Sequence, residues 1–206
     1  MMLEDPIFKK RFGISTPIRY IPDVIVDPEA EVIFEKAWKR FIKKMGPSGG
    51  LIRRHRFDSF LNRIAKLGDD LPYTKRVAIK FISKKVGYGV FAKVSIPPYS
   101  ILNHYAGILK EDKKIDPDND STFMLSDFAK YSIDAQKAGN WCRFMNHSRE
   151  GDPSTNVIAW EHYSKFGPRI IFTAGRKGIR KGSQLLYSYG DSYWNEDDFL
   201  DLEIKS

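Results

Sequence analysis

Two short stretches decide the fold of this chain: Arg143–Ser148, with the sequence RFMNHS, and Leu185–Gly190, with the sequence LLYSYG. Alone, an Asn-His pair beside a Ser is typical of a capped loop, and two alternating Tyr are typical of a half-buried strand. Their order is informative because a Gly-x-Gly turn, Gly87–Gly89, lies upstream of both. Glycines at such a turn let the backbone come close to a ligand.

The composition is that of a folded chain, because 42% hydrophobic and 14% aromatic residues in 206 suffice for a core. The single cysteine, Cys142, excludes a disulfide framework and any cysteine-based zinc cluster made by this chain alone. It agrees with a reducing intracellular compartment. Residues 1–11 lack the apolar segment of a secretory signal, and no run of about 18 apolar residues is present, so no membrane association is expected.

The net charge of +8 is unevenly distributed. Residues 1–80 carry 17 Lys and Arg against 10 Asp and Glu, whereas residues 81–206 carry 17 against 16. This asymmetry predicts a basic N-terminal region at residues 1–76, a second domain at 77–194 and an acidic tail at 195–206.

The N-terminal region is predicted to be helical. Asp27 and Pro28 form a typical helix start, and Gly46 and Pro47 end that helix. A second helix is predicted at Phe57–Leu67, and the basic residues 53–56 lie between the two helices. The inward positions expected from helical spacing are Ala30, Ile33, Phe34, Ala37, Trp38, Phe41 and Met45 in the first helix, and Phe57, Phe60, Leu61 and Ile64 in the second.

The basic residues in the range 36–56 allow two interpretations. They could form a solvated helix face packed on the neighbouring domain, or an electrostatic patch for DNA or nucleosomal phosphates.

From Val77 onward the pattern changes to short β segments separated by turns, so we expect a mostly β fold of small sheets with a helical N-terminal extension. The predicted strands are Val77–Ile82, Gly89–Val94, Ile101–Tyr105, Ser132–Asp134, Val157–Trp160, Arg169–Ala174 and Gln184–Tyr189.

The motifs together resemble the SET-domain protein-lysine methyltransferases over roughly Val77–Trp194. Arg143–Ser148 matches the family pattern Arg-Phe-x-Asn-His-Ser at every fixed position. The other matching segments are the glycine motif around Gly87–Gly89, Tyr105–Gly107 for Tyr-x-Gly, Asn156, and Arg169–Gly190 for the last motif. The sequence departs from the usual family residues at Val86, Ile108, Gln184 and Ser188.

The resemblance implies several small β-sheets in which the Asn-His strand and the final Tyr motif thread past each other, an exception to unknotted topology. It implies S-adenosyl-L-methionine as cofactor, in-line methyl transfer to a lysine amine and no metal. The amine must be neutral, although free lysine has a pKa of about 10.4. Desolvation and a nearby sulfonium charge would lower this pKa, and aromatic walls would exclude water.

Roles of individual residues follow from their matching positions. Tyr189 matches the catalytic tyrosine, and Tyr105 is expected to line the lysine channel, with ordinary core packing as its alternative. Tyr187 matches the Phe/Tyr switch position, where a phenol is associated with monomethylation. The expected cofactor-binding residues are Gly87, Tyr88, Gly89, Arg143, Phe144, Asn146, His147 and Trp194. For Arg143 and Trp194, structural roles are equally open.

The chain lacks the cysteine-rich segment that follows the last motif in many eukaryotic relatives, and in this it resembles small SET proteins of bacteria and viruses. The acidic stretches 111–127 and 191–203 could hold a basic peptide by charge complementarity. The expected substrate is therefore a histone or a bacterial histone-like protein.

Two alternatives remain: a lysine methylase of a non-chromatin protein, and a non-catalytic SET-like module that binds chromatin or DNA through residues 36–56. A homo-oligomer is also open. The expected location is the cytoplasm or, for a bacterial effector, the nucleus of a host cell.

Overall fold

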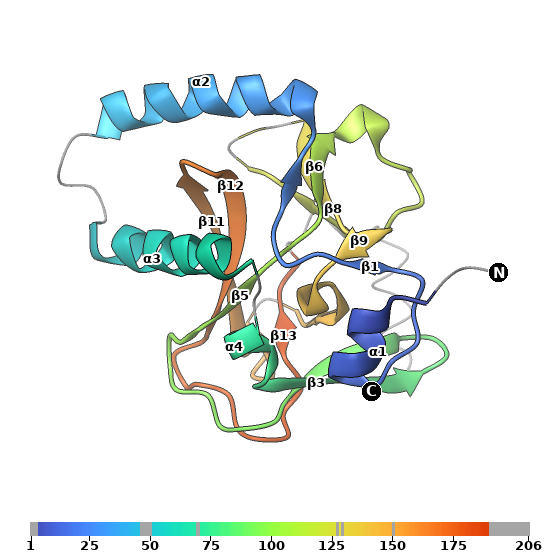
Figure 1. Cartoon of the computed structure of the whole chain (residues 1–206). Coiled ribbons are helices and arrows are strands. Elements are labelled where there is room, and N and C mark those ends of the chain that lie inside the picture. The colour runs from blue at the N-terminus through green and yellow to red at the C-terminus, as the bar shows by residue number, and fades with distance from the viewer. Residues whose placement is uncertain are drawn as a thin grey trace.

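The computed structural model describes residues 4–45, 51–68, 71–126, 128, 130–149 and 151–189. Small β-sheets occupy the centre, with α2 across the top of the view, α3 at the left and α1 at the lower right (Figure 1). The helices are α1 (Pro6–Phe12), α2 (Pro28–Met45), α3 (Leu51–Leu67) and α4 (Leu71–Thr74), with short 3-10 turns η1 (Asp112–Lys114) and η2 (Trp141–Phe144). The strands are β1 (Arg19–Tyr20), β2 (Ile25–Val26), β3 (Val77–Ser83), β4 (Gly87–Ala92), β5 (Ile101–His104), β6 (Ile108–Glu111), β7 (Thr122–Met124), β8 (Tyr131–Asp134), β9 (Ala138–Gly139), β10 (Asn146–His147), β11 (Val157–Ser164), β12 (Gly167–Ala174) and β13 (Leu186–Tyr187).

The strands form one four-stranded sheet, β2-β6-β8-β7, one three-stranded sheet, β11-β12-β5, and the two-stranded pairs β1-β9, β3-β4 and β10-β13. The predicted class, mostly β with a helical N-terminal extension, is confirmed. The parallel pair β10-β13 joins strands that are distant in the sequence, whereas the threading of one past the other stays a prediction.

The N-terminal region also contributes strands, which the sequence pattern did not indicate. Strand β1 pairs in parallel with β9 to form a two-stranded sheet, and β2 pairs in parallel with β6 at the edge of the four-stranded sheet. The division into an N-terminal region at residues 1–76 and a second domain at 77–194 stays a prediction. The pairings of β1 with β9 and of β2 with β6 are compatible with it but do not establish it.

Helix α1 begins at an Asp-Pro pair and ends at a glycine. The Asp5 carboxylate accepts hydrogen bonds from the backbone amides of Ile7 and Phe8, and Gly13 ends the helix with φ +69°. The second carboxylate oxygen of Asp5 accepts from the amide of Tyr20, 2.9 Å away. A single acidic side chain therefore caps α1 and fixes it against β1.

Helices α2 and α3 agree only in part with the helical-spacing prediction. The four predicted inward residues of α3 are all buried, in a cluster with Ile171 of β12. In α2, Ala30 and Phe34 are buried, but Ile33 is 43% exposed, so its predicted inward position is wrong. Among the described contacts of α2, the helix packs on β12 and β6, and Phe34 meets the rings of Phe128 and Tyr131, while Ile33 faces mostly solvent.

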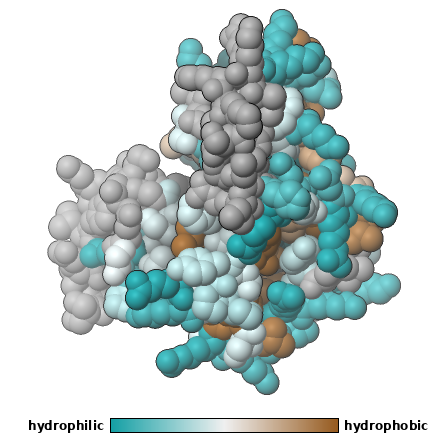
Figure 2. All heavy atoms as spheres, turned by 90° about the vertical axis from the view of Figure 1, so that its left-hand side faces the viewer, coloured by the Kyte–Doolittle hydropathy of each residue, from teal (hydrophilic) through white to brown (hydrophobic). Residues whose placement is uncertain are grey.

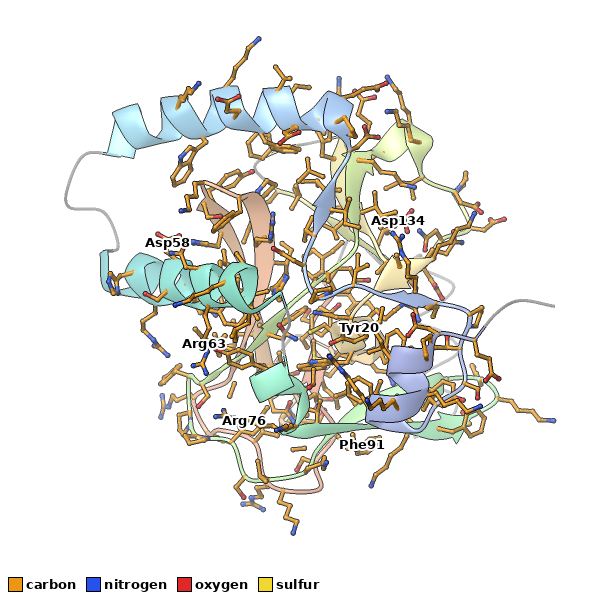
Figure 3. All side chains as sticks on the ribbon, in the orientation of Figure 1. Tyr20, Asp58, Arg63, Arg76, Phe91 and Asp134 are labelled. Carbon is orange, nitrogen blue, oxygen red and sulfur yellow. The ribbon has the colours of Figure 1, made fainter. Side chains whose placement is uncertain are left out.

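The basic residues 53–56 lie within the first turns of α3 and not in a connection between two helices, which corrects the sequence prediction. Farther along α3, Asp58 extends toward β11, where its Oδ1 atom lies 2.9 Å from Nε2 of His162 (Figure 3). The face that carries the ends of α2 and α3 is mostly hydrophilic where its residues are described, with small hydrophobic patches between (Figure 2).

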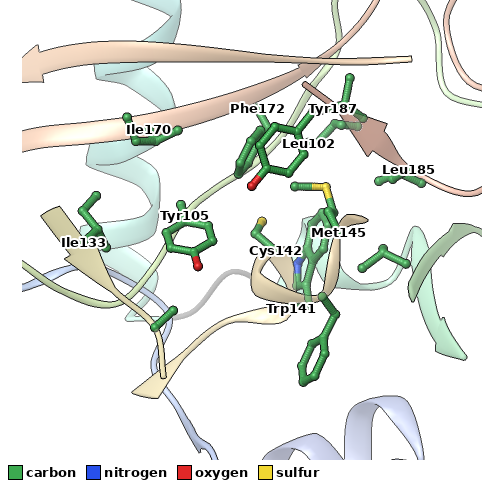
Figure 4. Close-up of a cluster of buried hydrophobic side chains, with 14 of the residues drawn as sticks. Leu102, Tyr105, Ile133, Trp141, Cys142, Met145, Ile170, Phe172, Leu185 and Tyr187 are labelled. Carbon is green, nitrogen blue, oxygen red and sulfur yellow. The ribbon is translucent and has the colours of Figure 1, made fainter. Parts of the chain in front are cut away.

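The main core lies where β5, β12, β13 and η2 meet (Figure 4). Trp141, Phe172 and Leu185 are fully buried there, and Tyr105 and Tyr187 are buried beside them. Because two of the predicted site residues belong to this core, their positions are fixed by close packing.

Candidate active site

The pairing of β10 with β13 brings the two diagnostic stretches together. Asn146 lies opposite Leu186, and His147 lies opposite Tyr187. Beyond the pair, the backbone amide of Tyr189 donates a hydrogen bond to Nδ1 of His147, 3.1 Å away. Residues about forty positions apart in the sequence therefore meet in one place, as the motif analysis predicted.

Asn156 holds β13 in this position from the other side. Its Oδ1 atom accepts from the amide of Leu186 at 3.1 Å, and its Nδ2 atom donates to the carbonyl of Gln184 at 2.8 Å. Its own amide donates to the Leu186 carbonyl at 3.1 Å. An asparagine supplies both the donor and the acceptor that this arrangement requires.

A cavity of about 590 Å³ opens beside β7 and β13. All three predicted catalytic residues, Tyr105, Tyr187 and Tyr189, line it. The other lining residues are Asp112, Asp120, Ser121, Thr122, Phe123, Met124, Leu125, Ser126, Lys130, Tyr131 and Arg143.

Aromatic rings form one wall of this cavity. The Tyr187 ring stacks on Phe123, with 9° between the planes and 6.1 Å between centroids. The same ring packs against Phe172, with 4.9 Å between centroids (Figure 4). It also packs against Tyr189, with 4.7 Å between centroids. This wall is suited to an aliphatic chain, because flat aromatic faces contact methylene groups and exclude water.

Two phenol hydroxyls in the cavity have fixed orientations. The Tyr189 hydroxyl donates to the Met145 carbonyl at 2.7 Å, and the Tyr105 hydroxyl donates to the Ser121 carbonyl at 3.0 Å. With its hydrogen directed at Met145, the Tyr189 oxygen presents its lone pairs to other groups.

Arg143 lies on the cavity wall, where its Nε atom donates to the Ala135 carbonyl and an Nη atom donates to Oγ of Ser121, both at 2.8 Å. Burial lowers the pKa of Arg143, but a guanidinium remains charged at neutral pH. The structure thus places Arg143 beside Tyr105 and the cavity. The neighbouring Phe144 is buried, and its ring packs against Phe8 and Tyr88.

The glycine turn lies next to the Asn-His motif. The Asn146 side-chain amide donates to the Tyr88 carbonyl at 3.2 Å, which joins the two motifs directly. A Cβ atom at Gly89 would lie 2.5 Å from Cδ1 of Ile82 and 2.8 Å from Nε2 of Gln184, so a larger residue would have to displace the ends of these two side chains. Gly87 has φ +74° and open space where a Cβ atom would be.

This donor set fits S-adenosyl-L-methionine. The turn offers backbone amides and carbonyls, Asn146 offers a side-chain amide, and Tyr88, Asn146, His147 and Tyr189 are all only partly buried. The remaining predicted cofactor contact, Trp194, lies outside the described residues, as do the acidic tail and the stretch 191–203. Within the parts of the chain that the structure describes, no group of three or more His, Cys, Asp or Glu could hold a metal ion. No helix in those parts is long and apolar enough to cross a membrane.

Several cavity residues were not found by sequence reasoning. Phe123 and Ser121 lie in an irregular, acidic stretch where no motif or periodicity marks them. Phe172, which supports the cavity residue Tyr187 without lining the cavity itself, was predicted only as a strand residue. Asp112 and Asp120 belong to the acidic stretch 111–127, and the structure places both at the cavity.

His147 is expected to titrate below the usual histidine pKa of about 6.5. Partial burial lowers its pKa, and the charge of Arg149 lowers it further. The neutral ring accepts the hydrogen bond from the Tyr189 amide, and protonation of Nδ1 would abolish that bond. The stabilisation that this bond provides is therefore fully present above the usual histidine pKa and is lost as the pH falls through the lowered pKa of His147. An NMR titration of the His147 ring checks this, and Arg149→Gln should move the midpoint upward. A midpoint at or above the usual value would contradict the assignment.

Comparison with known proteins identifies the family. The sequence model of the SET domain matches residues 87–190, about half of the chain, and the chain belongs to the SET-domain family. The resemblance drawn from the motifs is thereby confirmed.

Among curated relatives, the human histone-lysine N-methyltransferase EHMT1 is 31% identical over 117 residues, which are 55% of this chain and 9% of that protein. The histone-lysine N-methyltransferase set-17 of Caenorhabditis elegans is 34% identical over 114 residues, 53% of this chain and 39% of that protein. The chain therefore spans well under half the length of these relatives. ATXR5, solved in complex with histone H3.1 mono-methylated on R26, superposes with a TM-score of 0.60 over 87% of this chain and 83% of that chain, at 18% identity, and so shares the fold.

Proposed function

We propose that this chain is an S-adenosyl-L-methionine-dependent protein-lysine N-methyltransferase. The observation that carries the proposal is the placement of Tyr105, Tyr187 and Tyr189 around one aromatic cavity, next to the Asn146–Tyr88 contact. The cofactor would be held by the backbone of Gly87–Gly89 and by Asn146 and His147, and it supplies an activated methyl group. Family membership and the names of the relatives support the same activity.

The residues of this chain would act mainly by positioning. The rings of Phe123, Tyr187 and Tyr189 would hold the aliphatic stem of a lysine and exclude water. Exclusion of water disfavours the ammonium form, so the pKa of the bound lysine falls below about 10.4 and the neutral amine becomes accessible. The Tyr189 oxygen, oriented by Met145, would fix the direction of the amine. Alignment of this kind supplies a large part of the rate enhancement.

The proposed substrate is a histone or a histone-like basic protein. Asp112 and Asp120 at the cavity, whose lining also includes Lys130 and Arg143, offer carboxylates to the basic residues that flank a target lysine. The names of the curated relatives support a histone substrate, as does the histone H3.1 peptide in the ATXR5 complex.

Labelled methyl transfer to a panel of core histones, linker histones and a bacterial histone-like protein tests the proposal, with Tyr189→Phe run beside the wild type. Labelling of at least one basic protein that the variant loses is the expected result. Labelling of a non-chromatin protein alone would overturn the substrate class and leave the reaction in place. Absence of both labelling and cofactor binding would favour a non-catalytic module.

Tyr187 is expected to restrict the product mainly to monomethyl-lysine. Its ring packs against both Phe123 and Phe172. At the matching position of the family, a phenol is associated with monomethylation because it can hold a water where a second methyl group would need room. Tyr187→Phe removes only that hydroxyl and should shift the product toward di- and trimethyl-lysine. Mass spectrometry of a methylated peptide measures the shift. Mostly trimethyl-lysine from the wild-type protein would contradict the assignment.

A further inference from the structure

Two long parts of the sequence contain no acidic residue. Residues 71–110 and 162–190 lack Asp and Glu altogether but contain many Lys and Arg. Seven of these cations are exposed and lie in three segments that come together in the fold; we call them the basic surface. They are Lys75, Arg76, Lys93, Arg176, Lys177, Arg180 and Lys181.

Backbone contacts hold the three segments side by side. The Lys93 amide donates to the Arg76 carbonyl at 2.8 Å, and the Gly182 amide donates to the Ala92 carbonyl at 2.8 Å. Ile96 and Ile179 form an antiparallel bridge between the loops around them. In Figure 1 the loops that precede β5 and follow β12 run together at the lower edge, and Figure 3 labels Arg76 near this edge.

Gly178 makes this contact between the loops possible. Its φ is +68°, and a Cβ atom there would lie 2.5 Å from the Ile96 carbonyl oxygen. The loops are therefore closely apposed, and the cations on both are kept within one surface.

The basic surface has no acidic counterpart in the part of the chain that the structure describes. None of its seven side chains forms an ion pair with a described Asp or Glu, whereas lysines elsewhere do so, for example Lys110 with Asp134 and Lys114 with Asp27. Like charges held together by the fold repel one another, and a polyanion would relieve this repulsion.

We propose that the basic surface binds the phosphate backbone of duplex DNA. Lys and Arg side chains on several segments can contact successive phosphates without reading the sequence. The cavity differs from this surface in charge, because Asp112 and Asp120 line it together with the cations Lys130 and Arg143. A partner that presents both a basic peptide and a polyanion, such as a basic protein bound to DNA, would match both surfaces. This choice of DNA over other polyanions rests on the proposed function.

The proposal differs from the earlier interpretation of residues 36–56, which assigned DNA contact to the helices. The basic surface lies on the SET domain itself, and its side chains are described and exposed. The two locations are separable by mutation.

Fluorescence anisotropy of a labelled DNA duplex with the full-length protein tests the proposal over about 50 to 200 mM salt. The test variant is Lys93→Gln/Arg180→Gln/Lys181→Gln. The matched control, Lys36→Gln/Lys39→Gln/Lys66→Gln, removes the same charge from exposed positions of α2 and α3. We expect the test variant to bind about 10-fold more weakly or worse, and the slope of log K against log salt to fall by about 2 to 3. The control should bind as the wild type does.

Three results would overturn the proposal: no duplex binding by the wild type, equal weakening by both variants, or preferential binding to single-stranded RNA or to phosphatidylserine vesicles. Methyl transfer to a free peptide should be unchanged in both variants, which shows that they are folded. Since binding is measured without any reaction, an inactive but DNA-binding protein would refute the proposed function and leave this inference standing.

Discussion

Tyr189→Phe is expected to lower kcat for methyl transfer by about 10²- to 10³-fold, with little change in the KM for the peptide. The ring remains and still packs on Tyr187 and His147, so binding of the lysine stem is retained. The lost group is the hydroxyl that Met145 orients at 2.7 Å. Removal of one preorganised polar group at a reacting centre typically costs a factor of this size.

A matched control is Tyr73→Phe, which removes a phenol hydroxyl from a ring that packs on Phe60, away from the cavity. It should leave kcat within about twofold of wild type, since it alters no group that lines the cavity. Tyr189→Phe also leaves the Met145 carbonyl without this donor and should cost about 1 kcal/mol of stability. Cofactor binding, measured by calorimetry, should persist. A kcat close to wild type would remove Tyr189 from the catalytic role.

The fold was predictable where the signal is local. Each of the seven β segments predicted from Val77 onward overlaps an observed strand, whereas β6, β7 and β9 were not predicted. Helix α1 carries the same Asp-Pro start as α2 and a glycine at its end, so Asp5, Pro6 and Gly13 could have revealed it. Strands β1 and β2 could not be foreseen, because two-residue strands have no periodicity and their partners, β9 and β6, are distant in the sequence.

The site residues were predictable where they belong to motifs whose order in the sequence matches the family. The pairing of Asn146 with Leu186 and the meeting of three tyrosines follow from matched positions, not from periodicity. Phe123 has no such marker, and only the packing of β7 against β13 shows that it faces Tyr187. The basic surface was hidden for a similar reason. Its cations are dispersed along the sequence, and counting charge by segment assigned the basic excess to residues 1–80.

Asp23→Ala is expected to lower the free energy of unfolding by about 3 to 4 kcal/mol. Arg169 is only 3% exposed, and its Nε atom donates to Oδ1 of Asp23 at 2.8 Å. Nε2 of the fully buried His104 lies 3.0 Å from the same oxygen. Removal of the carboxylate leaves the buried Arg169 guanidinium without its counter-ion. This lowers the free energy of unfolding more than replacement of both partners would. His104 immediately precedes Tyr105, so this cluster also joins the N-terminal region to the wall of the cavity.

The matched control is Asp58→Ala, which removes an aspartate from His162 at a comparable distance of 2.9 Å. Asp58 is 36% exposed, and water can replace it, so its loss should cost less than about 1 kcal/mol. Urea unfolding at neutral pH measures both variants. In the double variant Arg169→Met/Asp23→Ala, the decrease in the free energy of unfolding should be smaller than the sum of the two single decreases, because no unpaired guanidinium stays buried. An Asp23→Ala loss no larger than that of Asp58→Ala would show that Arg169 does not depend on this carboxylate.

The pH dependence provides a second check on the same cluster. Burial alone would raise the pKa of Asp23, but the contact with His104 and the charge of Arg169 outweigh burial and hold the pKa well below its usual range. A carboxylate with a depressed pKa stabilises the folded state fully above its unfolded pKa of about 3.9 and loses that contribution only as the pH falls toward the lower value. The stability difference between wild type and Asp23→Ala should therefore be constant from about pH 5 to pH 8 and shrink only in stronger acid. A difference that already shrinks near pH 6 would mean that the carboxylate is not held ionised by this cluster.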